Sequence, residues 1–209
     1  MKGIKLKISK PEERLFTGSS KMFGDPDVWN GFEWPYVEEN GERYDLTFLC
    51  QINCAEVFPF DKEGLLPETG MLYFFYDLDT MPEATDGRSA RVLWYDGDIL
   101  TLNKMMLTDE NGNSLTFCEQ KIDFEEETEK EQPSHLLLGD ATLNGTADLE
   151  CIKNSGCAKD TVLLLQLCSI ETEDAQISFK DSGRLCFYID AGSLKERDFS
   201  RVKAVQTAR

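Results

Sequence analysis

Hydrophobic positions in this chain gather in short runs that are separated by Gly, Asp, Asn and Pro. Met71–Tyr76 is apolar at every position, and Leu185, Phe187 and Ile189 share one face of a second aromatic run. Short, aromatic-rich runs punctuated by Gly favour strands over helices. We therefore predict a mainly β, roll-like fold with strands near residues 3–8, 46–53, 71–76, 90–95, 115–124, 162–168, 185–189 and 201–206.

Turn residues define the ends of several of these elements. Asn111-Gly112 lies between two short apolar segments and predicts a β-hairpin turn. Gly70 and Gly183 each precede an aromatic run and suit turn positions with positive φ. The pattern indicates few helices, and we expect single short ones near 9–13 and 193–199.

Three features recur in the same order at nearly constant spacing. Gly24-Asp25 returns as Gly139-Asp140, a Gln inside an apolar run returns from Gln51 to Gln166, and the Gly-led aromatic run returns from Gly70 to Gly183. Apolar strands can resemble one another by chance, but the embedded Gln and the leading Gly make chance a weaker explanation.

We therefore predict a single domain, residues 1–209, with an internal duplication. Two β-rich halves, about 20–108 and 134–199, would pack with pseudo-two-fold symmetry. The polar, Glu-rich stretch 123–133 would form a solvated acidic connection between them.

The charge balance restricts the class of partner. The chain has 22 basic and 39 acidic residues, a net charge of −17. Nucleic acids and anionic membranes are polyanionic and are bound by clustered Lys and Arg, so we expect neither as a partner. A basic protein or an extended basic peptide fits this charge, and solubility alone would also explain it.

Cysteine usage and hydropathy indicate the compartment. The seven Cys are odd in number, and several lie inside apolar runs, as small buried side chains do. Residues 1–30 contain no apolar segment typical of a signal peptide, and the run Met71–Tyr76 is too short to span a bilayer. We expect a cytoplasmic protein in a reducing environment; the sequence leaves the oligomeric state open.

Residues that commonly carry catalysis or hold metals are sparse. His135 is the single histidine and is followed by three Leu, which favours a structural role. Cys50/Cys54 and Cys151/Cys157 lack zinc-site spacing, and the segment beginning at Asp109 lacks the Gly and Glu of a calcium loop. No phosphate-binding glycine loop is present. We predict no catalytic residue, no metal site and no cofactor.

Acidic pairs provide the alternative hypothesis of a hydrolase or divalent-metal-dependent enzyme. Two carboxylates one residue apart can hold a metal ion or act as an acid and a base. They also commonly end strands and begin turns. Asp77 and Asp190 occupy matching repeat positions, which favours the second role there. The pairs are Asp25/Asp27, Asp61/Glu63, Asp77/Asp79 and Asp96/Asp98.

Gln51 and Gln166 are the most informative polar positions. Each interrupts an apolar strand, and a buried amide needs hydrogen-bond partners to offset its desolvation. The pair could brace the junction between the halves, which we favour, or line a shared groove for an extended peptide.

The ordered motifs resemble the bacterial YwqG-like family, a domain of unknown function. The resemblance runs from about residue 20 to the C-terminus. It is carried by Ser20-Lys21-Met22-Phe23-Gly24-Asp25-Pro26, Trp34-Pro35, Leu46–Asn53, Leu66–Phe75, Leu163–Leu167, Asp181–Ile189 and Leu194–Phe199. Trp34 is our third candidate binding residue, after Gln51 and Gln166.

The resemblance implies a duplicated, mainly β roll and offers no agreed catalytic residues. It also implies kinship with ribosome-assembly chaperones and with immunity-type or adaptor proteins. Asp25 and Asp140 stand where the family commonly has a second Gly. We therefore expect an uncharacterised protein-binding module; a structural protein without a specific ligand is a further alternative.

Overall fold

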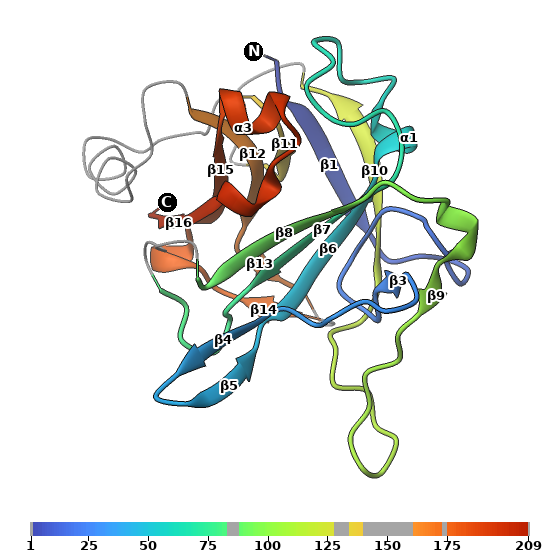
Figure 1. Cartoon of the computed structure of the whole chain (residues 1–209), viewed down its shortest axis with the longest axis vertical. Coiled ribbons are helices and arrows are strands. Elements are labelled where there is room, and N and C mark those ends of the chain that lie inside the picture. The colour runs from blue at the N-terminus through green and yellow to red at the C-terminus, as the bar shows by residue number, and fades with distance from the viewer. Residues whose placement is uncertain (1, 83–87, 128–133, 140–160, 173–174, 209) are drawn as a thin grey trace.

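A ten-stranded antiparallel sheet dominates the structure, a computed structural model that describes residues 2–82, 88–127, 134–139, 161–172 and 175–208 (Figure 1). In spatial order its strands are β16 (Lys203–Thr207), β15 (Arg184–Asp190), β12 (Thr161–Cys168), β11 (Leu136–Leu137), β1 (Ile4–Ser9), β10 (Gln120–Glu126), β2 (Lys21–Met22), β6 (Thr47–Asn53), β7 (Met71–Tyr76) and β8 (Ala90–Tyr95). The predicted mainly β fold is confirmed.

Smaller elements surround this sheet. In the described part of the chain, three two-stranded sheets pair β3 (Asp27–Val28) with β9 (Asn103–Lys104), β4 (Tyr36–Glu39) with β5 (Glu42–Asp45), and β13 (Ile170–Glu171) with β14 (Gln176–Ile177). The helical segments are α1 (Cys54–Val57), α3 (Ala191–Lys195) and the 3₁₀ turns η1 (Ile99–Thr101), η2 (Lys180–Ser182) and η3 (Phe199–Arg201).

Several local predictions need correction. Residues 9–13 form no helix, and the strand expected over 115–124 is β10, which begins at Gln120. β10 continues to Glu126, so the first residues of the expected acidic connection belong to a central strand; residues 128–133 lie outside the described residues. Pairing with β1 decides this, because a polar strand is stable once its backbone groups are bonded on both sides.

The sheet curls until its two edge strands approach each other, enclosing the main core. Trp94 on β8 packs edge-to-face near Phe199, which precedes β16, with ring centroids 6.3 Å apart. Gln206 on β16 donates a hydrogen bond to the Tyr76 hydroxyl on β7, 3.2 Å away. Inside, Phe74 of β7 meets Phe187 of β15 edge-to-face at 5.4 Å, so both ends of the sheet contribute to one core.

The strands on either side of β1 and β10 correspond in order and register. Met22 and Cys50 pair between β2 and β6, as Leu137 and Leu165 pair between β11 and β12, 115 residues later. Both long strands carry an irregularity at the matching position, at Leu49 in β6 and at Leu164 in β12.

Along the chain, the strands of the large sheet form two groups: the first is β1, β2, β6, β7 and β8, and the second is β10, β11, β12, β15 and β16. The first strand of each group pairs with a short strand of the other group. β1 pairs with β11, and β10 pairs with β2. β1 and β10 pair with each other through the middle of the sheet, where Lys7 lies opposite Asp123. The two groups are therefore interlocked and do not form separate sheets.

Two glycines occupy matching positions for one steric reason. A Cβ on Gly70 would lie 2.2 Å from the Tyr95 carbonyl oxygen, and one on Gly183 would lie 1.9 Å from that of Thr207. Gly70 has the predicted positive φ of 91°, but Gly183 has φ −89°, so that prediction is wrong for Gly183. Close approach of the neighbouring strand requires glycine at both sites.

The shared core predicts that each half depends on the other for stability. Phe74→Ala should lower the free energy of unfolding by about 3–5 kcal/mol, because it leaves a cavity at the Phe187 contact. Phe16→Ala is the matched control, since Phe16 is 86% exposed, and should change it by less than about 0.5 kcal/mol. Urea denaturation measures both; equal losses would contradict a core shared across the sheet.

Candidate functional site

An aromatic layer covers the outer face of β6, β7 and β8. Phe48, Tyr73 and Phe75 project from the strands, and Trp34 packs edge-to-face on Phe75 with centroids 5.3 Å apart. The Trp34 indole N–H donates to the Leu46 carbonyl oxygen at 2.8 Å, which fixes the ring where the chain enters the β4–β5 hairpin. Trp34 therefore has a fixed orientation at the edge of a rigid layer.

A projecting segment, residues 105–117 and here called the arm, is anchored at its base. The Met105 N–H donates to the Pro26 carbonyl oxygen (2.8 Å), and the Leu107 N–H donates to Asp25 Oδ1 (2.9 Å). On its return, the arm receives a hydrogen bond at the Phe117 carbonyl oxygen from the Gly24 N–H (3.1 Å). Asp25 thus holds the arm in place.

The arm tip contains the predicted hairpin turn in a minimal form. The Leu115 N–H donates to the Leu107 carbonyl oxygen at 2.9 Å, and Thr108 bridges Ser114. The Asp109 side chain accepts hydrogen bonds from the N–H groups of Asn111 and Asn113, both at 2.8 Å. The acidic residue that suggested a calcium loop therefore caps this turn.

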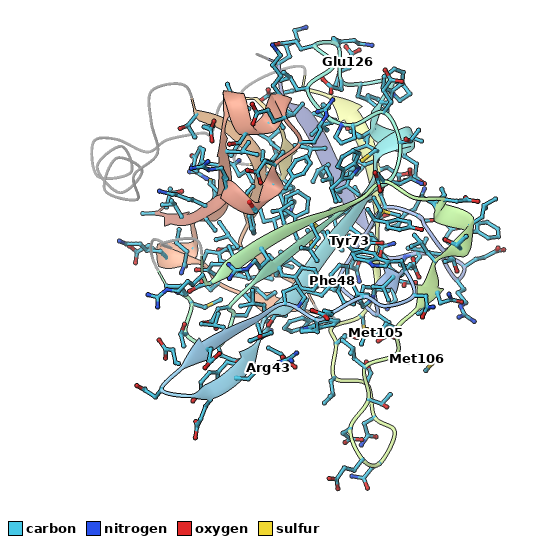
Figure 2. The ribbon with its side chains drawn as sticks, viewed as in Figure 1. Arg43, Phe48, Tyr73, Met105, Met106 and Glu126 are labelled. Atoms are coloured by element: carbon cyan, nitrogen blue, oxygen red, sulfur yellow. The ribbon has the colours of Figure 1, made fainter. Side chains whose placement is uncertain are left out.

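A cleft of about 480 Å³ separates the arm from the β4–β5 hairpin, and both project from the same end of the molecule (Figure 1). Figure 2 labels Arg43, Phe48 and Met105, which come from the hairpin, the sheet and the arm and all line the cleft. Its lining is Phe23, Trp34, Arg43, Asp45, Leu46, Thr47, Phe48, Met105, Leu107, Leu115, Thr116 and Phe117.

Apolar side chains in and beside this cleft are exposed to solvent. Leu115 is 68% exposed and Phe117 is 37% exposed, although Phe117 also packs on Phe23 at 5.1 Å. Met106, on the outside of the arm, is 71% exposed (Figure 2). Contiguous exposed apolar side chains on a rigid frame are typical of binding surfaces.

One wall of the cleft is an open strand edge. Asn40 and Gly41 both have positive φ, which gives the two-residue turn of a tight hairpin. The Leu46 N–H donates to the Pro35 carbonyl oxygen, which sets the alternation of bonded and non-bonded pairs. The backbone N–H and C=O groups of Arg43 and Asp45 therefore point away from β4. Within the described residues β5 pairs with β4 alone, so this edge is unpaired.

The two segments that flank the cleft carry more carboxylates than cations, although Asp45 is the one carboxylate in the cleft lining itself. The hairpin has four carboxylates against one guanidinium, that of Arg43, which is paired with Asp45 at 2.8 Å and lies 4.1 Å from the centroid of Tyr36. The arm contains two carboxylates and no Lys or Arg. The carboxylates are Glu38, Glu39, Glu42 and Asp45 on the hairpin and Asp109 and Glu110 on the arm.

Gln51 is fully buried beneath the aromatic layer, with every amide group engaged. Its Oε1 accepts from the Asp27 N–H (2.9 Å), and its Nε2 donates to the Ser19 carbonyl oxygen (2.9 Å) and to Asp27 Oδ2 (2.7 Å). Asp27 is also paired with the buried Lys21 at 3.2 Å. This arrangement holds β2, β3 and β6 together.

Gln166 makes the matching contact in the other group of strands. Its Nε2 donates to the Ser134 carbonyl oxygen at 2.8 Å, the position 115 residues after Ser19. Four strands, β11, β1, β10 and β2, separate β12 from β6, so the structure does not bring the two amides together. Each supports its own part of the sheet, and of the three candidate binding residues Trp34 alone lines the cleft.

Comparison with known protein families identifies the family of this chain. Residues 20–206 match the family model of a domain of unknown function, DUF1963. The chain belongs to the DUF1963 family. No curated protein matches the chain. Among the described residues of this DUF1963 domain, no helix is long and apolar enough to cross a membrane.

The acidic pairs of the DUF1963 domain hold turns. Asp77 Oδ1 accepts from the Asp79 and Thr80 N–H groups, and Asp190 accepts from Ser193 in the matching way. Asp98 Oδ1 accepts from the Leu100 N–H at 2.9 Å. Within the described part of the chain, no three His, Cys, Asp or Glu side chains gather to form a metal site.

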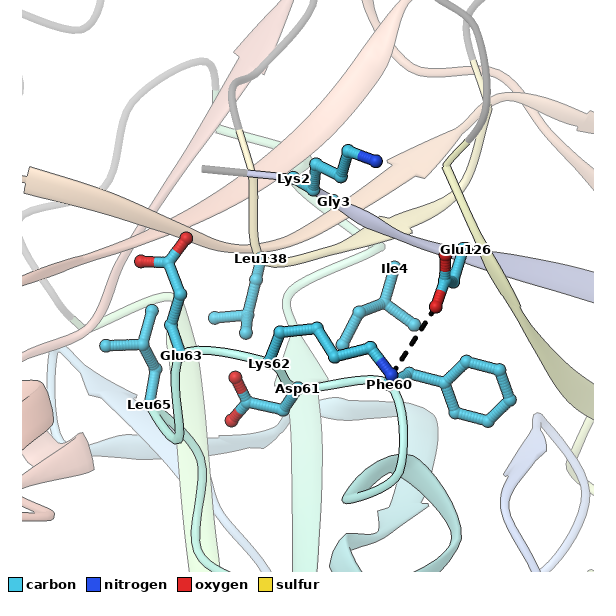
Figure 3. Close-up of a pocket in the computed structure, with 10 residues that line it drawn as sticks. All are labelled: Lys2, Gly3, Ile4, Phe60, Asp61, Lys62, Glu63, Leu65, Glu126 and Leu138. Carbon is cyan, nitrogen blue, oxygen red and sulfur yellow. Dashed lines mark ion pairs between the residues drawn. The ribbon is translucent and has the colours of Figure 1, made fainter.

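Asp61 and Glu63 line a second cavity of about 320 Å³ (Figure 3). Asp61 Oδ2 accepts from the Leu66 N–H at 2.7 Å, so this carboxylate stabilises its own loop. Lys62 is paired with Glu126 at 3.4 Å across the cavity mouth. Its apolar lining side chains are buried or partly buried, whereas the cleft exposes Leu115 and Phe117, which makes this cavity a weaker candidate than the cleft.

His135 is a structural residue of this domain. Its Nδ1 accepts from the Cys168 N–H at 3.3 Å, and burial lowers its pKa to about 4. Burial also raises the pKa of Cys168 to about 11, so this neighbouring thiol remains protonated at neutral pH.

Sequence reasoning found the turn at the tip of the arm but missed the β4–β5 hairpin, and it did not predict the cleft between them. The hairpin signal was present, since Asn40-Gly41 joins two four-residue strands, 36–39 and 42–45. The arm carried the same signal at Asn111-Gly112, but Leu115 and Phe117 resemble strand residues in sequence, so their exposure in a cleft was not predicted.

The lowered pKa of His135 predicts a loss of stability in mild acid. Its native pKa of about 4 lies below the unfolded value of about 6.5, so the unfolded chain takes up a proton first as pH falls. Between pH 7 and pH 5, the free energy of unfolding of the wild type should fall by about 1–2 kcal/mol more than that of His135→Asn. The side-chain carbonyl oxygen of this Asn can accept the same hydrogen bond from the Cys168 N–H. Urea titrations at both pH values measure the difference; parallel losses would contradict it.

Proposed function

We propose that this DUF1963 domain is a protein-binding module whose cleft holds an extended segment of a partner protein. The observation that carries the proposal is the exposed apolar lining, chiefly Leu115 and Phe117, facing the fixed ring of Trp34. Burying such side chains against a partner would remove apolar surface from water and favour association.

The open edge of β5 supports an extended conformation for the bound segment. The outward N–H and C=O groups of Arg43 and Asp45 can bond to a strand added alongside β5. Strand addition obtains affinity from backbone hydrogen bonds and specificity from alternate side chains that enter pockets. Every second side chain of the segment would enter the apolar cleft.

The excess of carboxylates on the hairpin and the arm, the two segments that flank the cleft, supports a basic partner. A segment that alternates apolar residues with Lys or Arg would place apolar side chains in the cleft and cations near the carboxylates of the hairpin and the arm. The net charge of −17 would speed the encounter with such a partner at low ionic strength.

The proposal extends to the role and location of the protein in the cell. A cytoplasmic adaptor or chaperone of the YwqG-like type would bind a protein partner and need no catalytic residues. The matched register of β6 and β12, and the paired contacts of Gln51 with Ser19 and Gln166 with Ser134, support an internal duplication. The cleft itself belongs to the first group of strands.

A peptide selection on the whole chain tests this function. A displayed library of random peptides should enrich segments that alternate apolar residues with Lys or Arg. Synthetic copies of the selected peptides should bind the wild-type chain, as measured by fluorescence anisotropy. Their affinity for Leu115→Ser should be about tenfold weaker. Leu100→Ser is the matched control, because Leu100 is 88% exposed and lies outside the cleft, and it should bind as the wild type does.

Backbone methylation of the selected peptide tests the strand addition. Methylating one alternate set of amides should abolish binding, and methylating the other set should leave it nearly unchanged, because one set alone faces β5. Equal effects of the two sets would overturn the strand-addition mode. Failure to enrich peptides sensitive to Leu115→Ser would overturn the proposed function itself.

A further inference from the structure

Arg184, at the start of β15, is a buried cation that has no partner among the residues that the structure describes. It is 1% exposed, and its Nε and both terminal nitrogens have no hydrogen-bond partner. None of the ion pairs in the described residues includes it. Burying a guanidinium without a counter-charge costs free energy of folding, so a buried Arg without a partner needs an explanation.

The residues that pair with Arg184 in the sheet are polar, and within the described residues no carboxylate lies within ion-pair distance of it. Cys168 on β12 and Thr207 on β16 lie directly opposite it in register, so the three side chains share one face of the sheet. The Thr207 hydroxyl is also buried without a hydrogen-bond partner. Both thiols near Arg184, those of Cys168 and Cys186, have pKa values raised by burial and are neutral.

The corresponding position in the other group of strands shows that the fold does not require a charge here. Met71 begins β7 as Arg184 begins β15, and it pairs with Asn53 and Tyr95 at the positions that match Cys168 and Thr207. Met71 is fully buried in the aromatic layer. An apolar side chain therefore satisfies the backbone geometry, and Arg184 has another role.

We propose that Arg184 forms the centre of an oxyanion-binding site, with a carboxylate or phosphate group as its ligand. The planar fork of the guanidinium matches two oxygens of such a group, and the Thr207 hydroxyl can donate a further hydrogen bond. The bound anion supplies the negative charge that a buried guanidinium requires. This site is on β15 and β16 and is independent of the cleft beside β5.

Anion-dependent stability of the whole chain tests the site. Urea denaturation is followed with increasing acetate, phosphate or chloride at matched ionic strength, for the wild type and for Arg184→Met. At least one oxyanion should raise the wild-type midpoint saturably, and chloride should not. The comparison of acetate with phosphate identifies which oxyanion the site prefers.

Arg184→Met introduces the residue type that occupies the corresponding position in β7, Met71. It removes the charge and keeps a long, unbranched side chain. Its apparent affinity for the oxyanion should be at least about tenfold weaker than that of the wild type. Its stability without added anion should equal or exceed that of the wild type, because a buried unpaired charge has been removed. An equal anion response in both proteins would overturn the site, since general salt exclusion would then explain the effect.

A second measurement keeps the test decisive if Arg184→Met fails to fold. The Arg184 Nε–H resonance of the wild type, assigned by its absence from Arg184→Lys, should shift saturably with acetate or phosphate. A resonance unchanged by both anions would overturn the proposal.

Discussion

The antiparallel pairing of β1 with β10 joins the two groups of strands into one sheet. Each of these strands comes from one group and lies beside the short strand of the other, so neither group can complete its hydrogen bonds alone. Across the interior, the Phe74 ring of β7 contacts the Phe187 ring of β15, so core packing also joins the two groups. Backbone pairing and core packing therefore impose one constraint, and the sheet forms as a whole.

This shared frame carries two different outer layers. Over β6 to β8 the layer is aromatic and extends into the hairpin and the arm, where Trp34 and Phe117 frame the cleft. On β15 and β16 the corresponding face has a buried Arg184 in place of Met71. The two groups match in strand register, at β2–β6 and β11–β12, whereas the side chains on their outer faces differ.

The cleft and the Arg184 site follow different physical rules. The cleft is exposed, apolar and bounded by an open strand edge, which suits a flexible partner that orders on binding. Arg184 is buried, charged and rigidly placed, which suits a small anion with a fixed geometry. Both sites lie on the outer face of the sheet, because the interior of the curled sheet is filled by the core.

The sequence by itself determined the strands whose apolar runs are long and Gly-bounded, such as β6, β7, β12 and β15, because burial on both faces leaves a strong pattern. It also located the buried glutamines, since an amide inside an apolar run stands out. Tertiary structure alone decided that the polar segment ending at Glu126 is a central strand, that Gly183 is required by a neighbouring carbonyl oxygen, and that Leu115 and Phe117 face an open cleft. Each of these depends on what lies opposite in space, which no local pattern of residues records.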